Sequence, residues 1–318
     1  MQEKKYDVVC IGLVVADILL QPVDPGVFTV DTTRLDNIDL MPGGDAMNQA
    51  ITLANHGVNV ALSAQVGDDA FGNVLKQQAK LRGVAVTHML LNAKTSTSIC
   101  VVMIQPSGQR NFVYATGNND CFRYEDVSSS LWSEAKVISL GSLLGLRDFD
   151  SEKIAEGFRT AQATGTITVA DTAHDSHGLG LKSILPILPH IDYFIPSLEE
   201  AQLLLGAQEP QVLAASFLQY GAKNVVLKLG AEGCLVMNAQ EHFFLPTYQV
   251  QVVDTTGCGD NFTSGFILGL LRNESLRRCG QIANALGSFN ATSKGATSSQ
   301  KRTFQDVLGF MEATPLMR

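Results

Sequence analysis

The segment Asp254-Thr255-Thr256-Gly257-Cys258-Gly259-Asp260-Asn261-Phe262 joins an apolar extended run to a long apolar helix pattern. Its two glycines allow the backbone to come close to a bound group. The first turn of the helix would point N–H groups at the same place, and the helix dipole favours an anion there. Asp260 adds a carboxylate that could take a proton from a hydroxyl. The segment therefore suggests phosphoryl transfer, although a tight turn with an acid in the first helical turn also fits.

Other nucleotide-binding patterns are absent from the sequence. It contains no G-x-x-x-x-G-K-[ST] loop, and the first strand is followed by Gly12-Leu13-Val14-Val15-Ala16-Asp17 instead of G-x-G-x-x-G. Without a P-loop lysine, the 257–260 loop would hold a phosphate with backbone amides and the helix dipole.

Two other places in the chain could complete a ligand site. Pro42-Gly43-Gly44-Asp45-Ala46-Met47-Asn48 places paired glycines before a helix pattern, and Asn48 offers both a donor and an acceptor. Asp17 follows the first strand, where its carboxylate could accept hydrogen bonds from two sugar hydroxyls. The plainer alternatives are a tight turn with Asp45 as N-cap and a turn capped by Asp17.

Length and composition describe an ordinary globular protein. Its 318 residues can bury one large α/β core or two smaller ones, and 45% are hydrophobic while 17% are charged. The net charge of −8 and the absence of Lys/Arg runs argue against nucleic-acid or lipid-surface partners. No apolar run reaches the roughly 18 residues of a membrane span. The start of the chain lacks a signal-peptide pattern and the six cysteines form no C-x-x-C pair, so we expect a reduced, cytoplasmic enzyme.

Short β-branched runs alternate with helix patterns along most of the chain. This order predicts a mostly parallel sheet with helices on both faces. The expected strands are 8–11, 60–64, 137–140, 167–170, 193–195, 225–229, 233–237 and 242–246. The expected helices are 46–56, 70–82, 151–164, 198–205, 210–220, 260–271, 275–292 and 304–313.

Two segments depart from this alternation. Residues 13–42 carry prolines, aspartates and short apolar pieces, and residues 95–117 alternate as a hairpin that turns at Pro106-Ser107-Gly108. Together they predict a small β-sheet that projects near the strand ends, where α/β sheets bind ligands. Residues 1–318 would then form one domain with a β-lid.

These motifs resemble those of the PfkB family, the ribokinase-like carbohydrate and nucleoside kinases. The family signature D-T-x-G-x-G-D-x-F is matched at 254–262 without a gap, and a glycine pair followed by N-x-A is matched at 43–50. The run Val66-Gly67-Asp68-Asp69-Ala70-Phe71-Gly72 is also similar. The resemblance implies a three-layer α/β/α ribokinase-like fold, with a mostly parallel central sheet and a small projecting β-sheet lid.

The resemblance also implies roles for residues of this sequence. Asp260 matches the general base that takes the proton from the sugar hydroxyl attacking ATP. The backbone of the residues before it matches the anion hole for the transferred group: Gly257, Cys258 and Gly259. The sugar contacts are matched by Asp17, Gly43, Gly44 and Asn48. The nucleotide side is matched by Lys228, Gly230, Gly233 and Asn284.

ATP and Mg²⁺ are the cofactors that the resemblance implies. Family members often carry N-x-x-E where Ser197-Leu198-Glu199-Glu200 stands here, so Glu200 keeps the acid that acts on Mg²⁺ through water while Ser197 replaces Asn. A solvated helix acid is the alternative for Glu200. The loop 292–296 resembles a segment that borders adenine and, in some members, helps to hold K⁺. The lid matches one that closes over the sugar, excludes water and often mediates homodimers.

Departures from ribokinases leave the acceptor open. Ribokinases carry Asn two residues before the first sugar-binding Asp and Lys after the glycine pair, whereas this chain has Val15 and Asp45. The leading hypothesis is an ATP-dependent kinase acting on a hydroxyl, primary by preference, of a small sugar or sugar derivative. The alternatives are a nucleoside kinase, with Phe112 or Tyr114 as a shelf for the base, and a sugar-binding protein without activity.

Three further side chains have more than one interpretation. Arg110, on the lid hairpin, could reach an acidic or phosphorylated substrate, but an exposed lid arginine is the favoured interpretation. His174 and His177 lie in a polar loop after a strand end and could rim the pocket.

Overall fold

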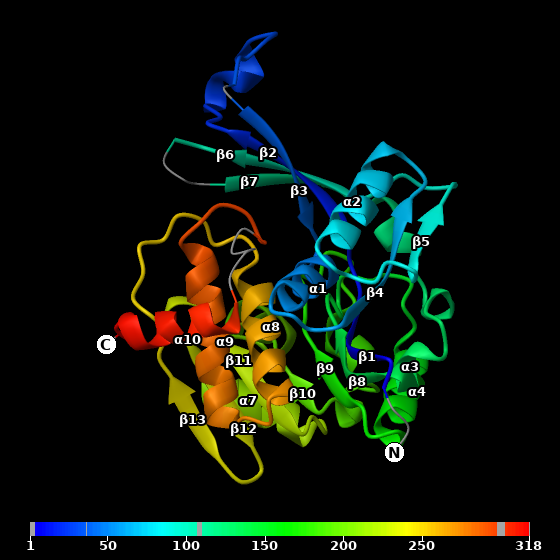
Figure 1. Cartoon of the computed structure of the whole chain (residues 1–318), viewed down its shortest axis with the longest axis vertical. Helices are drawn as coiled ribbons and strands as arrows, with labels where there is room; N and C mark the ends of the chain where they lie inside the picture. Colours follow the sequence, from blue (N-terminus) through cyan, green and yellow to red (C-terminus); the bar gives the residue numbers. More distant parts are fainter. Residues whose placement is uncertain (1–3, 36, 107–109, 298–302, 318) are drawn as a thin grey trace.

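A nine-stranded sheet runs through the centre of the molecule, in the order β13-β12-β11-β10-β9-β8-β1-β4-β5 (Figure 1). The computed structural model describes residues 4–35, 37–106, 110–297 and 303–317. At one edge β11 pairs antiparallel with β12 and β12 pairs antiparallel with β13, whereas all other neighbours in this sheet pair in parallel. The strands are β1 (Tyr6–Ile11), β4 (Val60–Gly67), β5 (Met89–Asn92), β8 (Ala135–Leu140), β9 (Ile167–Ala170), β10 (Tyr193–Phe194), β11 (Asn224–Lys228), β12 (Cys234–Asn238) and β13 (His242–Leu245).

Helices cover both faces of this sheet, because successive side chains of a strand point to opposite sides. Along β1, Val8 and Cys10 pack in the core that holds α1, α8 and α9, whereas Val9 and Ile11 pack in the core that holds α4 and α7. The helices are α1 (Asp45–Asn55), α2 (Ala70–Leu81), α3 (Leu131–Glu134), α4 (Ser151–Ala163), α5 (Gly180–Ile184), α6 (Leu198–Leu205), α7 (Pro210–Gln219), α8 (Cys258–Leu271), α9 (Leu276–Ala291) and α10 (Phe304–Ala313). The three-layer α/β/α arrangement is confirmed.

The helices and strands predicted for the main body are all observed, with bounds that shift by up to three residues. The prediction did not include β5, α3 or α5. α3 and α5 have four and five residues, too few to show a helical period, and β5 is a four-residue edge strand whose Leu90 and Leu91 are exposed, so it gives no buried-strand pattern. In the described part of the chain, no helix is both long and apolar enough to cross a membrane.

A second, four-stranded sheet projects from the main body as the lid, in the order β3-β2-β6-β7 (Figure 1). β2 and β6 pair in parallel at the centre, while β3 pairs antiparallel with β2 and β7 pairs antiparallel with β6. Its strands are β2 (Val15–Gln21), β3 (Asn37–Gly43), β6 (Ile99–Ile104) and β7 (Arg110–Ala115). Both predicted lid segments therefore contribute, as expected. Residues 107 and 108 of the turn predicted at Pro106-Ser107-Gly108 lie outside the described residues.

The lid continues directly into a helix of the main body. β3 ends at Gly43, and Gly44 is the N-cap of α1 with a φ of +89°. A Cβ on Gly44 would lie 2.5 Å from the carbonyl oxygen of Leu13, so glycine suits both the backbone angle and the space. α1 then packs on α8. The lid, the start of α1 and the start of α8 are thereby placed close together.

Candidate active site

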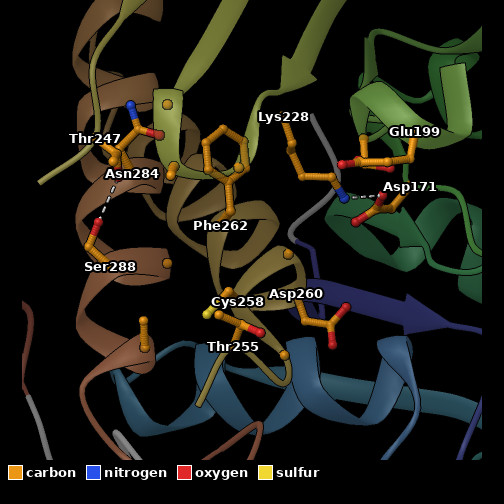
Figure 2. Close-up of a pocket in the computed structure, with 18 of the residues that line it drawn as sticks. Asp171, Glu199, Lys228, Thr247, Thr255, Cys258, Asp260, Phe262, Asn284 and Ser288 are labelled. Carbon is orange, nitrogen blue, oxygen red and sulfur yellow. Dashed lines mark hydrogen bonds and ion pairs between the residues drawn. The ribbon is translucent and has the colours of Figure 1, made fainter. Parts of the chain in front are cut away.

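A cavity of about 570 Å³ opens where β9, β10 and β11 end. It lies between those strand ends, the first turn of α8 and one side of α9 (Figure 2). Its size is typical of a site for a small molecule or cofactor. The carboxyl ends of parallel strands are also where α/β sheets bind ligands. The cavity is therefore the candidate active site.

The loop before α8 has a shape that favours glycine. Gly257 is the N-cap of α8 with a φ of +71°, and a Cβ there would lie 2.4 Å from the Cβ of Ala296. Asn261 donates to the carbonyl oxygens of Gly257 at 2.8 Å and Ala296 at 2.7 Å. Asn290 on α9 donates to the carbonyl oxygen of Thr256 at 2.7 Å. These bonds hold the first turn of α8, whose N–H groups lack intrahelical acceptors, at the wall of the cavity.

Asp260 stands in this first turn and lines the cavity. Its Oδ2 accepts a hydrogen bond from Asn48 Nδ2 at 2.7 Å, which joins α8 to α1. Burial raises the pKa of Asp260 well above its usual range, with the Asp45 carboxylate acting in the same direction and the Asn48 hydrogen bond opposing it. A carboxylate with a raised pKa is a stronger base, so Asp260 suits the removal of a proton from a hydroxyl.

Replacing Asn48 with alanine is expected to move the acid limb of the pH–rate profile to higher pH. The change removes the hydrogen bond that favours the Asp260 carboxylate, so the pKa of Asp260 rises further. Because a general base acts only when deprotonated, kcat/KM then declines at a higher pH than in the wild type. The matched control is Thr52→Val, which loses a hydrogen bond to Asn261 one turn further along α1. An acid limb that moves equally in both variants, or in neither, would contradict this role.

The residues predicted to contact a sugar gather at the junction of the lid with α1. Asp17 on β2 lies so close to Gly43 of β3 that a Cβ on Gly43 would be 2.1 Å from Asp17 Oδ2. Burial, helped by Asp45, raises the pKa of Asp17 to about 7. Asn48 is 4% exposed, and its Oδ1 has no hydrogen-bond partner among the described residues. The structure thus brings Asn48 into contact with Asp260 and Asp17 next to Gly43, but the 570 Å³ cavity is lined by Asp45 and not by Asp17 or Asn48.

The residues predicted on the nucleotide side all line the cavity: Lys228, Gly230, Gly233 and Asn284. Gly233 also has a structural reason, because its φ is +102° and a Cβ would lie 2.0 Å from the carbonyl oxygen of Leu245. Asn284 Nδ2 donates to that same carbonyl oxygen at 3.0 Å. The Asn284 amide is therefore engaged in the fold, and its role toward a nucleotide stays a prediction.

Glu200 belongs to a capping box at the start of α6. Its Oε2 accepts hydrogen bonds from the Ser197 N–H at 2.8 Å and from the Thr172 hydroxyl at 2.5 Å. Ser197, which stands where family members often carry Asn, is the N-cap of α6. Residues that the structure describes include no group of three or more His, Cys, Asp or Glu side chains arranged to hold a metal ion. Glu200 lines the cavity, and this arrangement fits a Mg²⁺ that takes few protein ligands and keeps most of its waters, so the role of Glu200 toward Mg²⁺ through water stays a prediction.

Arg110 does not point into solvent, so the favoured interpretation of this residue is wrong. Its side chain is 23% exposed, and Nη1 lies 2.7 Å from Oδ1 of Asp254. It also donates to the hydroxyls of Thr255 and Thr256. Asp254 Oδ2 accepts the Gly295 N–H at 2.9 Å. The lid strand β7 is thereby tied to the loop before α8.

One histidine and one aspartate complete the cavity wall near β9. His174 lines the cavity, as proposed, whereas His177 Nε2 lies 3.2 Å from Asp120 Oδ1. Asp171, which the sequence motifs do not single out, lines the cavity and forms an ion pair of 2.7 Å with Lys228. The signal that could have found Asp171 is its place directly after a buried strand, at the ligand-binding edge of the sheet.

Comparisons with known proteins show the family of this chain. A family model described as "pfkB family carbohydrate kinase" matches residues 5–303. The chain is 28% identical over 289 residues to the ribokinase of Haemophilus influenzae, covering 89% of this chain and 91% of that protein. It is 28% identical over 271 residues to the aminoimidazole riboside kinase of Salmonella typhimurium, covering 81% of this chain and 84% of that protein.

Solved structures share the fold. Arabidopsis thaliana ribokinase complexed with ribose and ATP has a TM-score of 0.80 at 22% identity, covering 96% of this chain and 99% of that one. An E. coli protein in complex with ATP and Mg²⁺ has a TM-score of 0.83 at 22% identity, with the same coverage. With the family model spanning nearly the whole sequence, the chain belongs to the pfkB family of carbohydrate kinases.

Proposed function

We propose that this protein transfers the γ-phosphoryl group of ATP to a hydroxyl, primary by preference, of a small sugar or sugar derivative. The observation that carries the proposal is the position of Asp260. A base held by Asn48 and an anion-binding helix start occur within one turn of α8, at the wall of a ligand-sized cavity. Transfer of a phosphoryl group to an alcohol needs both. Relatives named ribokinase and fructokinase support a sugar as the acceptor.

Each part of the site has one task in this proposal. Asp260 takes the hydroxyl proton as the oxygen attacks the phosphorus. The N–H groups of Gly257, Cys258 and Gly259 stabilise the charge on the transferred group, each by about 3–4 kcal/mol if it behaves like an oxyanion-hole donor. The acceptor is held by Asp17, Gly43, Gly44 and Asn48. Mg²⁺ would neutralise phosphate charge at the end of the cavity near Glu200.

Replacing Arg110 with glutamine is expected to loosen the lid over the site. The change breaks the ion pair to Asp254 and weakens the bonds to the two threonine hydroxyls. We expect the KM for the acceptor to rise about tenfold, the value of one charged hydrogen bond. The ratio of ATP hydrolysed to acceptor phosphorylated should also rise, because an open lid admits water. Initial rates measure the KM, and the amount of ADP compared with the amount of phosphorylated acceptor measures the ratio.

The control for this prediction is Arg34→Gln, which changes an exposed arginine in the lid segment 13–42. It should leave both quantities at their wild-type values. If Arg110→Gln also leaves them unchanged, the tie between lid and loop has no part in the reaction.

A nucleoside is the second candidate acceptor, because one relative is an aminoimidazole riboside kinase. Phe112 and Tyr114 on β7 are 58% and 43% exposed, so their rings are free to stack against the base of a nucleoside. A binding protein without activity is the weakest alternative, since the Asp260 carboxylate and the glycines of its loop are all retained.

A coupled ADP-release screen tests the proposal. The acceptors are pentoses, hexoses, ketoses, sugar acids, inositols and nucleosides, each with ATP and Mg²⁺ and with K⁺ or Na⁺. We expect acceptor-dependent ADP formation with one sugar class, and a K⁺ effect if the 292–296 loop holds that ion. ADP formation with nucleosides alone would favour the second candidate. Sugar binding by calorimetry without ADP formation would support the inactive alternative.

Two further features belong to the proposal. A homodimer through the lid would cover exposed apolar side chains of β7, among them Phe112 and Val113. Light scattering measures this state. We place the reaction in the cytoplasm, because all six cysteines are free thiols, as is usual in reducing compartments.

A further inference from the structure

A buried ion pair stands beside Asp260 and spans neighbouring strands. Lys228 ends β11 and Asp171 directly follows β9, while β10 lies between these strands in the sheet. Lys228 Nζ lies 2.7 Å from Asp171 Oδ1, and the two side chains are 13% and 2% exposed. Figure 2 shows the pair at the cavity wall, on the same side as Asp260. The ion pair therefore crosses the carboxyl end of β10 at the candidate active site.

Asp171 is held in place by two further donors. Its Oδ2 accepts the Thr263 hydroxyl at 2.7 Å, and its Oδ1 accepts the Thr172 N–H at 2.8 Å. Thr263 is buried on α8, three residues after Asp260. One carboxylate thus joins the ends of β9 and β11 to the helix that carries the candidate base. This arrangement fixes the place of the lysine ammonium relative to that helix.

Lys228 has donors to spare. An ammonium carries three N–H groups, and among the described residues only Asp171 accepts a hydrogen bond from it. A Cβ on Gly259 would lie 3.5 Å from Nζ, so the ammonium stands next to the first turn of α8. Burial opposes the positive charge, but the carboxylates of Asp171 and Glu200 outweigh it and raise the pKa of Lys228. A permanent positive charge therefore faces the cavity beside the helix start.

Stability alone is a weak reason for this pair. Buried ion pairs cost much desolvation and contribute little net stability compared with apolar side chains of similar size. A lysine also has a flexible stem, so its charge is useful in catalysis only when something holds it. A charge held beforehand where negative charge accumulates stabilises a transition state without reorganisation during the reaction.

We propose that Asp171 is a positioning residue that holds the Lys228 ammonium against the phosphoryl group as it passes from nucleotide to acceptor. The proposal rests on the proposed function. In the step, a bond forms between the acceptor oxygen and phosphorus, and the bond from that phosphorus to the bridging oxygen of ADP breaks. The hydroxyl proton goes to Asp260, and Lys228 keeps its proton throughout. Asp171 acts through Lys228 and touches neither substrate.

Nucleotide binding tests the proposal without any acceptor. Calorimetry gives the Kd of AMP-PCP, a non-hydrolysable ATP analogue, and of ADP, both with Mg²⁺, for the wild type, Asp171→Asn and Lys228→Met. We expect the wild type to prefer AMP-PCP, and both variants to lose about tenfold of that preference, as for one charge-assisted hydrogen bond. An unchanged preference in both variants overturns this proposal alone. A wild type that binds neither nucleotide overturns the proposed function as well.

Kinetics with the acceptor from the screen separates positioning from structure. Asp171→Asn should lower kcat about 10²-fold with little change in KM, as removal of one preorganised charge contact does. The double variant Asp171→Asn/Lys228→Met should be no slower than Lys228→Met, because Asp171 acts through the lysine. Additive losses would overturn the proposal. If Asp171→Asn does not fold, Thr263→Val, which removes one anchor of the same carboxylate, takes its place with the same outcomes.

The chain offers a matched control at the opposite, amino-terminal edge of the sheet. Asp192 directly precedes β10 and Lys223 directly precedes β11, and their charged atoms lie 2.6 Å apart. Asp192→Asn therefore removes a second Asp–Lys pair far from the cavity. It should lower the melting temperature without changing kcat or the preference for AMP-PCP. Equal effects of Asp171→Asn and Asp192→Asn on stability, kcat and nucleotide preference would show a structural role only.

Discussion

Replacing Asp260 with asparagine is expected to lower kcat by about 10²- to 10⁴-fold, the usual contribution of a general base, while the Kd for ATP changes little. The amide keeps the size of the side chain and can still bond to Asn48, but it cannot accept the proton of the attacking hydroxyl. Nucleotide affinity should persist because the N–H groups of the first turn of α8 are unaltered. Single-turnover kinetics and calorimetry measure the two quantities.

The control for this variant is Glu274→Gln, which removes an exposed carboxylate between α8 and α9. It should turn over like the wild type. Near-normal turnover in Asp260→Asn would remove Asp260 from the mechanism, whatever the acceptor.

Replacing Gly257 with alanine is expected to cost both stability and activity. The φ of +71° alone costs a non-glycine residue about 1–2 kcal/mol, and the added Cβ would lie 2.4 Å from the Cβ of Ala296. Relief of this contact must move the loop that orients the first turn of α8. We therefore expect a lower melting temperature and a loss of kcat of about 10²-fold, as for the loss of one oxyanion donor.

The same loop supplies a matched control for stability. Gly259 lies inside the first turn of α8, and a Cβ there would meet only Lys228 Nζ at 3.5 Å among the described residues. Gly259→Ala should therefore keep or raise the melting temperature, because alanine is the better helix former. A wild-type melting temperature in Gly257→Ala would mean that the turn is not constrained as described.

The alternation of strands and helices was predictable because it rests on local patterns. A buried parallel strand such as β1 contains an unbroken apolar run at 8–11, and a helix such as α9 is long enough for its apolar period to be read. α3 and α5 are too short to show a helical period, and β5 is an edge strand whose leucines are exposed. Their formation depends on packing against the elements around them.

The candidate site was predictable where its residues are contiguous in sequence. Gly257, Cys258, Gly259 and Asp260 form one loop and one helical turn, so a sequence motif describes them well. The contacts of Arg110 with Asp254 and of Lys228 with Asp171 join residues 144 and 57 positions apart. Such pairs depend on how the lid and the sheet are folded together, which no local spacing encodes. For the same reason Arg110 was assigned to the surface.

The central claim is that Asp260 and the first turn of α8 transfer a phosphoryl group to an acceptor hydroxyl. Mass analysis of the acceptor after incubation with ATP and Mg²⁺, with the wild type beside Asp260→Asn, tests it most directly. We predict that the wild type yields an acceptor carrying one added phosphoryl group, in step with ADP, and that the variant yields almost none. ADP formed without a phosphorylated acceptor, or equal product from the two proteins, would contradict the claim.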